Sequence, residues 1–321
     1  MTGTAAAPRT GIWLFPSRPA ADLVALAEEI ERAGLDELWL GDEGPARDPF
    51  GVLAAAAVRT ERLTLGIGIT SPYLRLPAVT AATALTLQEL SGGRAILGFG
   101  TGGAYALDPV GVRPKTPFGD TERAVRTARA VARREAGEGY APPEHAIPAQ
   151  PLPLYVGSRG ERLNRFASRE ADGALVGGVP LGLLERVVGW ARAEREIDIT
   201  LCLNVASDEA DREARRPGLA QILIDAPAFV REHFDLDVED LRAATAALAR
   251  GDEGPARAVV RDDVLDEYVI AGTDAEVDAK LVDIARAHRP TSIIIALLGE
   301  DPGALLGAAA QRLGALGGVQ A

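Results

Sequence analysis

Two segments of the chain carry residue types that could bind an anion. Gly157-Ser158-Arg159-Gly160-Glu161 stands between a short apolar run and a helical pattern, and Gly177-Gly178 follows the next apolar run. Glycines allow a ligand to approach the backbone, the first amides of a helix attract negative charge, and an arginine adds a positive charge. Ser158 and Glu161 also have the spacing of a capping box. Together these features predict a phosphate-binding cradle; the alternative is an ordinary helix cap with tight strand-to-helix turns.

Short apolar runs alternate with helical patterns along most of the chain, and these elements must position the two segments. The runs that favour strands lie at 11–16, 37–40, 63–70, 95–100, 154–157, 174–177, 197–205 and 292–298. Eight strand–helix units predict an α/β fold, a (β/α)8 barrel of the TIM type, with an open doubly wound sheet as the alternative. The pattern over 208–267 is helical without a clear strand. We therefore expect one barrel domain over residues 1–321, with a helical insertion at 208–267 before strand eight.

Two local contacts outside the strand ends also follow from the sequence. Thr273 and Glu276 have the spacing of a capping box at the start of a helix. Glu89 and Arg94 flank a Ser-Gly-Gly turn, and we expect them to form an ion pair beneath the barrel.

The composition excludes several classes of protein. Acidic residues number 46 against 34 basic ones, so the net charge of -12 argues against a nucleic-acid or anionic-membrane surface. The single cysteine, Cys202, excludes an intrachain disulfide and a cysteine-based metal cage. The three histidines lie far apart, so we expect no metal. No apolar run approaches the roughly 20 residues that span a bilayer, and no signal segment is evident, so a cytoplasmic protein is expected.

The residues that could catalyse a reaction by themselves are few. The two lysines fall in a loop and in a helical pattern, which argues against a Schiff-base aldolase. Asp42 and Glu43 are adjacent in the sequence, so they are poorly placed to flank a glycosidic bond. A glycine-lined, phosphate-capable site with few catalytic groups is typical of enzymes in which a cofactor carries the chemistry.

Four stretches resemble the luciferase-like superfamily, and within it the branch that uses the deazaflavin coenzyme F420, typified by methylenetetrahydromethanopterin reductase. They are 34–42 (GLDELWLGD), 65–73 (LGIGITSPY), 77–81 (PAVTA) and 87–100 (LQELSGGRAILGFG). The Leu-Ser-Gly-Gly-Arg-x-x-Leu-Gly-x-Gly run in the last stretch is the most specific. The resemblance resumes at 157–175 and at 268–298, and it weakens over 101–153 and 208–267.

The resemblance implies a (β/α)8 barrel with F420, or alternatively FMN, at the mouth formed by the carboxyl ends of the strands. It also implies a non-proline cis peptide between Gly68 and Ile69, backing the ring of the cofactor, and a phosphate end after strands five and six. The cofactor-binding residues expected on this basis are Gly68, Ile69, Thr70, Gly100, Gly157, Ser158, Arg159, Gly160, Gly177, Gly178 and Val179.

Two positions depart from the pattern of the family. Glu43 stands where the family usually has histidine, and Leu76 stands where a histidine often precedes Pro77. Glu43 could act as the catalytic acid if burial raises its pKa; the alternative is a solvated loop carboxylate. We expect Asp42 to contact the cofactor, with a turn residue as the alternative.

The function expected from the resemblance is an oxidoreductase. It would transfer a hydride between reduced F420 and a C=C or C=N bond, or between F420 and an alcohol or carbonyl, of a small organic substrate. A homodimer is expected. One alternative is an FMN-dependent luciferase-like monooxygenase, and another is a non-catalytic barrel that binds a flavin or deazaflavin.

Overall fold

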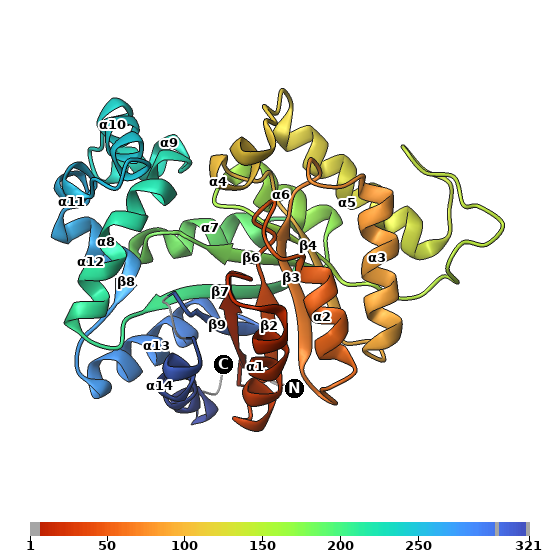
Figure 1. The fold of residues 1–321 in the computed structure, drawn as a ribbon, viewed down its shortest axis with the longest axis horizontal. Helices are drawn as coiled ribbons and strands as arrows, with labels where there is room; N and C mark the ends of the chain where they lie inside the picture. The colour runs from red at the N-terminus through yellow and green to blue at the C-terminus, as the bar shows by residue number, and fades with distance from the viewer. Residues whose placement is uncertain (1–6, 299–301, 319–321) are drawn as a thin grey trace.

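Eight parallel strands close into a barrel in the computed structural model, which describes residues 7–298 and 302–318 (Figure 1). The barrel strands are β1 (Arg9–Leu14), β2 (Glu37–Leu40), β3 (Thr64–Thr70), β4 (Ala95–Phe99), β5 (Leu154–Gly157), β6 (Gly173–Gly177), β7 (Asp198–Val205) and β9 (Ser292–Ala296). Strand β9 pairs with both β1 and β7, and β6 pairs with β7, so the ring is closed. The predicted barrel class is confirmed.

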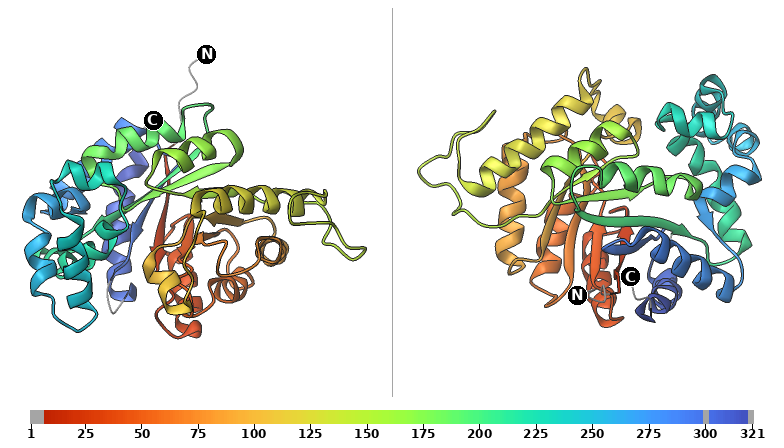
Figure 2. Two further views of the ribbon diagram at one scale, coloured as in Figure 1. Left: turned by 90° about the horizontal axis from the view of Figure 1, so that it is seen from above. Right: turned by 180° about the vertical axis from the view of Figure 1, so that it is seen from behind.

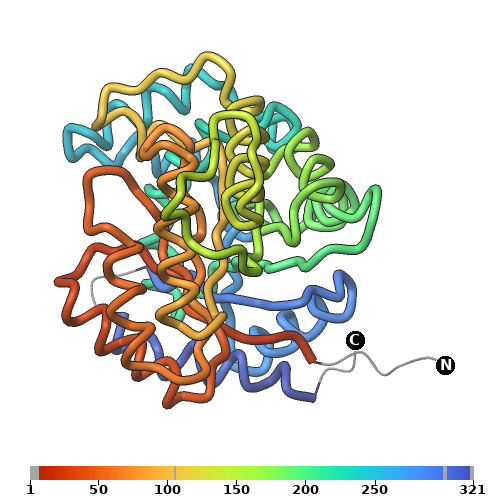
Figure 3. Tube along the Cα trace, turned by 90° about the vertical axis from the view of Figure 1, so that its right-hand side faces the viewer, coloured from red at the N-terminus to blue at the C-terminus, as the bar shows by residue number. Residues whose placement is uncertain are grey.

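Helices surround the barrel, as amphipathic patterns between the strands predicted. They are α1 (Ala20–Arg32), α2 (Pro49–Ala57), α3 (Pro77–Leu90), α5 (Pro117–Arg133), α6 (Glu161–Glu170), α7 (Leu184–Ala191), α13 (Asp274–His288) and α14 (Pro302–Gly314), with the short helices α4 (Ala104–Leu107), η1 (Asp108–Val110), η2 (Leu181–Leu183) and η3 (Ala315–Gly318). Figure 3 views the side of the molecule on which α3 and α5 lie next to each other. The Thr273–Glu276 capping box is present at the start of α13, as predicted.

A group of helices lies between β7 and the last barrel strand, as the predicted fold with an insertion before strand eight requires. These helices are α8 (Glu209–Ile224), α9 (Ala228–His233), α10 (Val238–Leu248), α11 (Gly254–Val259) and α12 (Asp262–Tyr268). They stand to one side of the barrel in both views of Figure 2. The two-residue strand β8 (Val269–Ile270), which the sequence did not predict, extends from α12 and pairs with the end of β7.

Large rings facing glycines fill the interior of the barrel. Trp39 and Tyr155 are fully buried, and their ring centroids lie 5.6 Å apart. A Cβ atom at Gly66, which pairs with Trp39 across β2 and β3, would lie 2.3 Å from the indole. A Cβ atom at Gly173 would lie 2.5 Å from the Tyr155 ring. These two glycines are therefore required by the bulk of the rings.

A buried carboxylate fixes the orientation of Trp39. Glu37 is fully buried and accepts hydrogen bonds from Trp39 Nε1 at 2.7 Å and from Arg9 Nε at 2.6 Å. A buried charge is tolerated when it is paired and hydrogen-bonded in this way. The end of the barrel opposite the mouth is thus closed by a polar network, and the indole is held in one position.

The expected ion pair between Glu89 and Arg94 is wrong. The Arg94 guanidinium instead donates to backbone carbonyl oxygens of Ala57, Thr60 and Leu63, at 2.9, 2.9 and 2.6 Å. Carbonyl groups at the end of a helix have no partner within the helix. Arg94 supplies donors to the groups that follow α2, and this explains an arginine in the Ser-Gly-Gly-Arg turn without a carboxylate partner.

Among the helices of the described residues, none combines the length and the apolar character that crossing a membrane would require.

Replacing Gly66 by alanine should destabilise the barrel, because the added methyl group would collide with the Trp39 indole. We expect Gly66→Ala to lower the free energy of unfolding by about 1–3 kcal/mol, as overpacking of a core does. Urea denaturation followed by circular dichroism measures this. The control is Gly189→Ala in α7, where a Cβ atom meets nothing within 4 Å; it should gain about 0.5–1 kcal/mol from helix propensity. Equal stability of the two variants would contradict the packing explanation.

Candidate active site

Strand β3 is irregular where it reaches the mouth of the barrel. The peptide between Gly68 and Ile69 is cis, as the resemblance implied. The register between β3 and β4 shifts between Ile67 and Thr70. The Gly68 carbonyl accepts a hydrogen bond from Trp13 Nε1 on β1. The backbone of the bulge is therefore held by an indole from β1, the second strand along from β3.

The Ile69 side chain lies over glycines at the ends of β4 and β5. A Cβ atom at Gly100 would lie 2.5 Å from Ile69 Cδ1, and one at Gly157 would lie 2.5 Å from Ile69 Cγ2. A Cβ atom at Gly98 would also approach this side chain, at 3.1 Å from Ile69 Cγ2. The three glycines make room for one side chain. This packing accounts for Gly100 and Gly157 without a ligand, and their predicted contact with a cofactor stays a prediction.

Asp42 is buried and its carboxylate is engaged within the protein. It accepts hydrogen bonds from Thr70 Oγ1 at 2.6 Å and from the Arg75 guanidinium. Arg75 also pairs with Asp48 at 2.5 Å and lies over the Phe50 ring, 5.0 Å from its centroid. Asp42 therefore joins the loop after β2 to the loop after β3, and Thr70 is part of this contact.

Glu43, the next residue, has a different environment. Burial, with a smaller contribution from the charge of Asp42, raises the pKa of Glu43 to about 7. A Cβ atom at Gly41 would lie 2.9 Å from Glu43 Oε1 and 2.9 Å from the edge of the Trp13 ring, so the two side chains lie close together. Within the described chain Glu43 forms no hydrogen bond or ion pair. Its carboxyl group could release or take up a proton near neutral pH.

The capping box expected at Ser158 and Glu161 is not formed. Helix α6 begins at Glu161 with Gly160 as its N-cap, and no side chain caps it. Ser158 Oγ accepts from the Gly160 amide at 3.1 Å, and Asn164 Nδ2 donates to the carbonyl oxygens of Ser158 and Gly160 at 3.1 and 2.8 Å. Asn164 holds the loop from below, so the amides of the first turn stay available to an anion.

Arg159 points from this loop toward the insertion. Its guanidinium donates to the carbonyl oxygens of Ile222 and Asp225 at 2.6 and 2.9 Å. Burial lowers the pKa of Arg159, and among the described residues no carboxylate lies within ion-pair distance of it. The Tyr268 hydroxyl is buried and has no hydrogen-bond partner within the described chain; the charge of Arg159 acts on it. An unpaired guanidinium and an unpartnered hydroxyl suit an anion.

The loop after β6 lies beside Arg159. Gly178 has φ 63, and a Cβ atom there would lie 3.5 Å from Ile222 Cγ2 and 3.7 Å from Arg159 Cδ. A Cβ atom at Gly177 would lie 3.1 Å from Cys202 Cβ, and Val179 is buried. The structure thus brings the predicted residues of the two loops together at one place.

Sequence reasoning missed Tyr268 as part of the mouth, since nothing in the residues around it indicates that its hydroxyl lies near Arg159. An apolar run such as that around Trp13 indicates a residue of the core or the pocket wall, but it gives no sign of the hydrogen bond to another strand. Arg75 follows the bulge of β3, but its two carboxylates lie 27 and 33 residues away in the sequence. Among the described residues, no group of three or more histidine, cysteine or acidic side chains could hold a metal ion.

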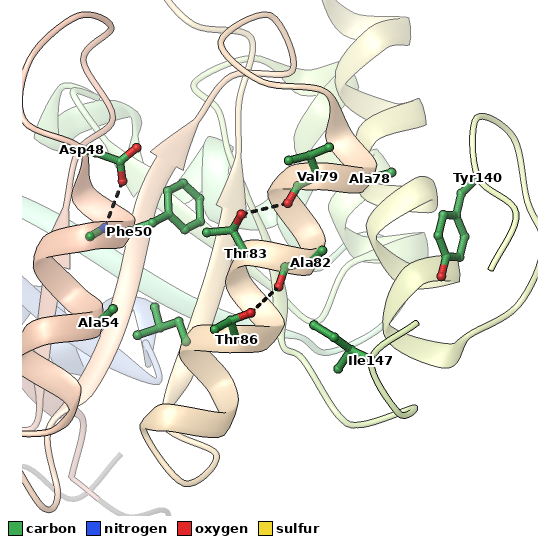
Figure 4. A pocket seen from close by; sticks show the side chains of 12 residues that line it. Asp48, Phe50, Ala54, Ala78, Val79, Ala82, Thr83, Thr86, Tyr140 and Ile147 are labelled. Atoms are coloured by element: carbon green, nitrogen blue, oxygen red, sulfur yellow. Dashed lines mark hydrogen bonds between the residues drawn. The ribbon is translucent and has the colours of Figure 1, made fainter. Parts of the chain in front are cut away.

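An apolar groove lies away from the mouth, on the outer face of α2 and α3 (Figure 4). Its lining includes Ala54, Ala82 and Val79, and Val79 is 54% exposed. Thr83 and Thr86 also line it, but their hydroxyls donate to the carbonyl oxygens of Val79 and Ala82 in their own helix, at 3.0 and 3.1 Å. The groove is therefore poor in free polar groups.

The fold and the mouth define a (β/α)8 barrel whose candidate site is built from the loops that follow the strands. A family model described as luciferase-like monooxygenase matches residues 1–289, and the chain belongs to this family.

Two curated relatives and one solved structure illustrate the similarity. The 5,10-methylenetetrahydromethanopterin reductase of Methanopyrus kandleri is 29% identical over 325 residues, covering 91% of this chain and 93% of that protein. The F420-dependent glucose-6-phosphate dehydrogenase of Kineococcus radiotolerans is 33% identical over 221 residues, covering 60% of this chain and 66% of that protein. The structure of the coenzyme F420 dependent tetrahydromethanopterin reductase from Methanopyrus kandleri superimposes with a TM-score of 0.77, at 26% identity and 98% coverage of both chains.

The raised pKa of Glu43 predicts that the difference in stability between Glu43→Gln and the wild type depends on pH. The folded carboxyl keeps its proton up to about pH 7, whereas the unfolded one, with the ordinary value of 4.5, has already lost it. In that window the folded state binds more protons, so ionisation of Glu43 lowers stability as the pH rises. Glu43→Gln should therefore be more stable than the wild type at pH 8 by about 1–3 kcal/mol, and similar to it near pH 4.

Urea denaturation at several pH values measures this difference. Glu135→Gln, at an exposed residue remote from the mouth, is the control and should follow the wild type at every pH. A constant difference between Glu43→Gln and the wild type from pH 4 to pH 8 would show that Glu43 has an ordinary pKa.

Proposed function

We propose that the protein is an F420-dependent oxidoreductase that transfers a hydride between the cofactor and a small organic substrate. The reacting bond of the substrate is C=C or C=N, or an alcohol and its carbonyl. The relatives described above support the cofactor, since their names state that they use F420 or reduce a methylene-bridged pterin. The observation that carries the proposal is the mouth itself, where Ile69 of the β3 bulge packs against Gly157, two residues before Arg159.

The residues present fit F420, whose ring is flat and whose side chain carries a phosphate and an acidic tail. The resemblance implies that the peptide between Gly68 and Ile69, which is cis here, would back the ring. Within the described chain, Arg159 has no anionic partner, and the Tyr268 hydroxyl has no hydrogen-bond partner. The first-turn amides of α6 and the backbone at Gly178 complete a cradle for a phosphate.

When bound, F420 supplies the carbon that donates or accepts the hydride. The protein's part is to hold the wall of the bulge in place, which the hydrogen bond from Trp13 to the Gly68 carbonyl does. Glu43 lies beside Trp13 and would give a proton to the substrate during reduction, or take one up during oxidation. Asp42 would position this segment, because Thr70 and Arg75 bind its carboxylate.

Two other functions compete with this proposal. An FMN-dependent monooxygenase would use the same barrel, because the luciferase-like family includes flavin enzymes. A non-catalytic barrel would bind the cofactor without turnover, and the absence of the expected histidines at positions 43 and 76 favours it. Leu76, at the start of α3, has no ionisable group, so it cannot replace a histidine in proton transfer.

The identity of the cofactor can be measured directly. Purified protein titrated with F420 and with FMN, followed by fluorescence, should bind F420 more tightly, because F420 brings additional negative charge to Arg159. Arg159→Ala should weaken F420 binding by about 10–100-fold, as loss of a charge-assisted contact does. It should leave binding of the tail-free deazaflavin nearly unchanged. Micromolar FMN binding without measurable F420 binding would favour the monooxygenase.

Glu43→Gln tests the proton transfer. It should retain F420 affinity and lower turnover by about 10²–10⁴-fold. Reduction of substrate by the wild type should slow as the pH rises through about 7, because only the protonated carboxyl can donate; oxidation should show the opposite trend. Glu135→Gln is the control. Wild-type turnover with an unshifted pH profile in Glu43→Gln would leave Glu43 outside the mechanism.

We also infer a homodimer, formed through the groove of α2 and α3. From Pro77 to Gln88, α3 contains no charged residue, and α2 contains none. Two copies facing each other would therefore bury no unpaired charge. Val79→Glu should convert the dimer to a monomer in sedimentation velocity experiments. Val110→Glu, at an apolar residue of η1 that is 42% exposed, is the control and should not. A wild-type monomer at micromolar concentration would exclude the homodimer.

A further inference from the structure

The end of helix α8 contacts loops that follow several different strands of the barrel. Arg159, after β5, donates to the last carbonyl groups of α8, and Gly178, after β6, lies against Ile222. Asp225, the C-cap of α8, reaches the loop after β4, where its Oδ2 accepts a hydrogen bond from the Ala104 amide at 3.0 Å. The corner of the insertion therefore spans the rim of the mouth from β4 to β6.

The position of Asp225 is unfavourable for α8 itself. A negative charge at the carboxyl end of a helix opposes the helix dipole. The compensating stabilisation is at the start of α4. The N-cap of this helix is Gly103, which has no side chain to cap it. The Asp225 carboxylate takes the role that an N-cap side chain usually has. A Cβ atom at Gly103 would lie 2.6 Å from Asp225 Oδ2, so glycine leaves the room that this contact needs.

Helix α4 in turn lies against the loop that carries Glu43. Gly44 has φ 76, and a Cβ atom there would lie 2.5 Å from the Ala106 carbonyl oxygen of α4. The same segment is tied to the loop after β3, because Ser71 Oγ donates to the Thr101 carbonyl at 3.0 Å. A continuous set of contacts therefore leads from the insertion through α4 to the residue beside Glu43.

We propose that Asp225 is a positioning residue that caps α4 from the insertion and so holds α4 against the Glu43 loop at the mouth of the barrel. The end of α8 acts as a strap across the rim, because Arg159 binds its carbonyl groups from the loop after β5 and the Asp225 side chain reaches the loop after β4. The bond to Ala104 is exposed, so water competes with it. The significance of the strap for catalysis rests on the proposed function, whereas the strap itself does not.

Hydrogen–deuterium exchange of the cofactor-free protein tests the strap. In Asp225→Ala, the amides of residues 101–107 should exchange about two- to tenfold faster, as expected for loss of one hydrogen bond of ordinary net strength. Asp225→Asn retains an acceptor oxygen and should stay close to the wild type. Asp240→Ala, at an exposed acidic residue of the insertion in α10, is the control and should exchange like the wild type. Wild-type exchange in Asp225→Ala would overturn the cap.

A second variant removes the donor of the hydrogen bond between Ala104 and Asp225. Ala104→Pro removes the donor N–H at the first position of α4, where proline fits a helix. Gly103 has φ -95 and ψ 176, an extended conformation that a following proline tolerates. The Ala104→Pro and Asp225→Ala changes should each speed exchange over residues 105–107, and the double variant should match either single one. Additive effects would overturn the proposed contact.

The pKa of Glu43 distinguishes a positioning role of Asp225 from a role that is limited to stabilising α4. In Asp225→Ala, but not in Asp225→Asn, the pKa of Glu43 followed by carboxyl NMR should fall from about 7 toward its ordinary value, because water enters the loosened loop. An unchanged pKa of Glu43 would overturn the positioning role. Neither measurement needs F420, so a failure of the cofactor to bind would reject the proposed function and leave the test of the strap intact.

Discussion

The interior of the barrel has room for few large side chains, and the shape of the mouth depends on how that room is divided. Trp39 occupies the centre, where the buried Glu37 carboxylate fixes its indole. Strand β3, beside it, has glycine at positions 66 and 68, since a Cβ atom at either would come within 3 Å of the indole. Further along the strand, Ile69 takes the space that glycines leave on β4 and β5. Much of the glycine pattern near the mouth thus follows from two side chains.

The two adjacent carboxyl groups at the mouth show how environment separates chemically similar residues. Thr70 and Arg75 bind the Asp42 carboxylate, so its charge is compensated within the protein. Glu43 has neither partner, and burial raises its pKa to about 7. The guanidinium that stabilises one carboxylate therefore leaves its neighbour to respond to burial and to the remaining charge of Asp42. This division agrees with the roles proposed above, in which Asp42 holds the loop and Glu43 transfers the proton.

The sequence predicted the barrel because eight apolar runs alternate with helical patterns, and turn residues separate the two. It also placed the two loops after β5 and β6, which are predicted to bind an anion, at one mouth, since the carboxyl ends of parallel strands must meet there. It failed for Arg94, whose guanidinium binds backbone carbonyl groups and not Glu89, and it did not foresee the carbonyl partners of Arg159. Carbonyl groups are present at every residue, so no residue pattern marks the ones that are used. The Ser158–Glu161 pattern failed for a related reason, because the Gly160 amide took the serine oxygen.

The exchange of histidine for glutamate at position 43 preserves one property of the site and changes another. An unperturbed histidine has a pKa near 6.5, roughly 2 units above that of glutamate. Burial brings Glu43 to about 7, so either residue would give up a proton in the same pH range. The charge differs, because histidine becomes neutral when it donates, whereas Glu43 becomes an anion beside Asp42. If Glu43 is the proton donor, as proposed above, this added negative charge would suit a substrate that is cationic or neutral after reduction and would disfavour one that places a carboxylate or phosphate next to Glu43.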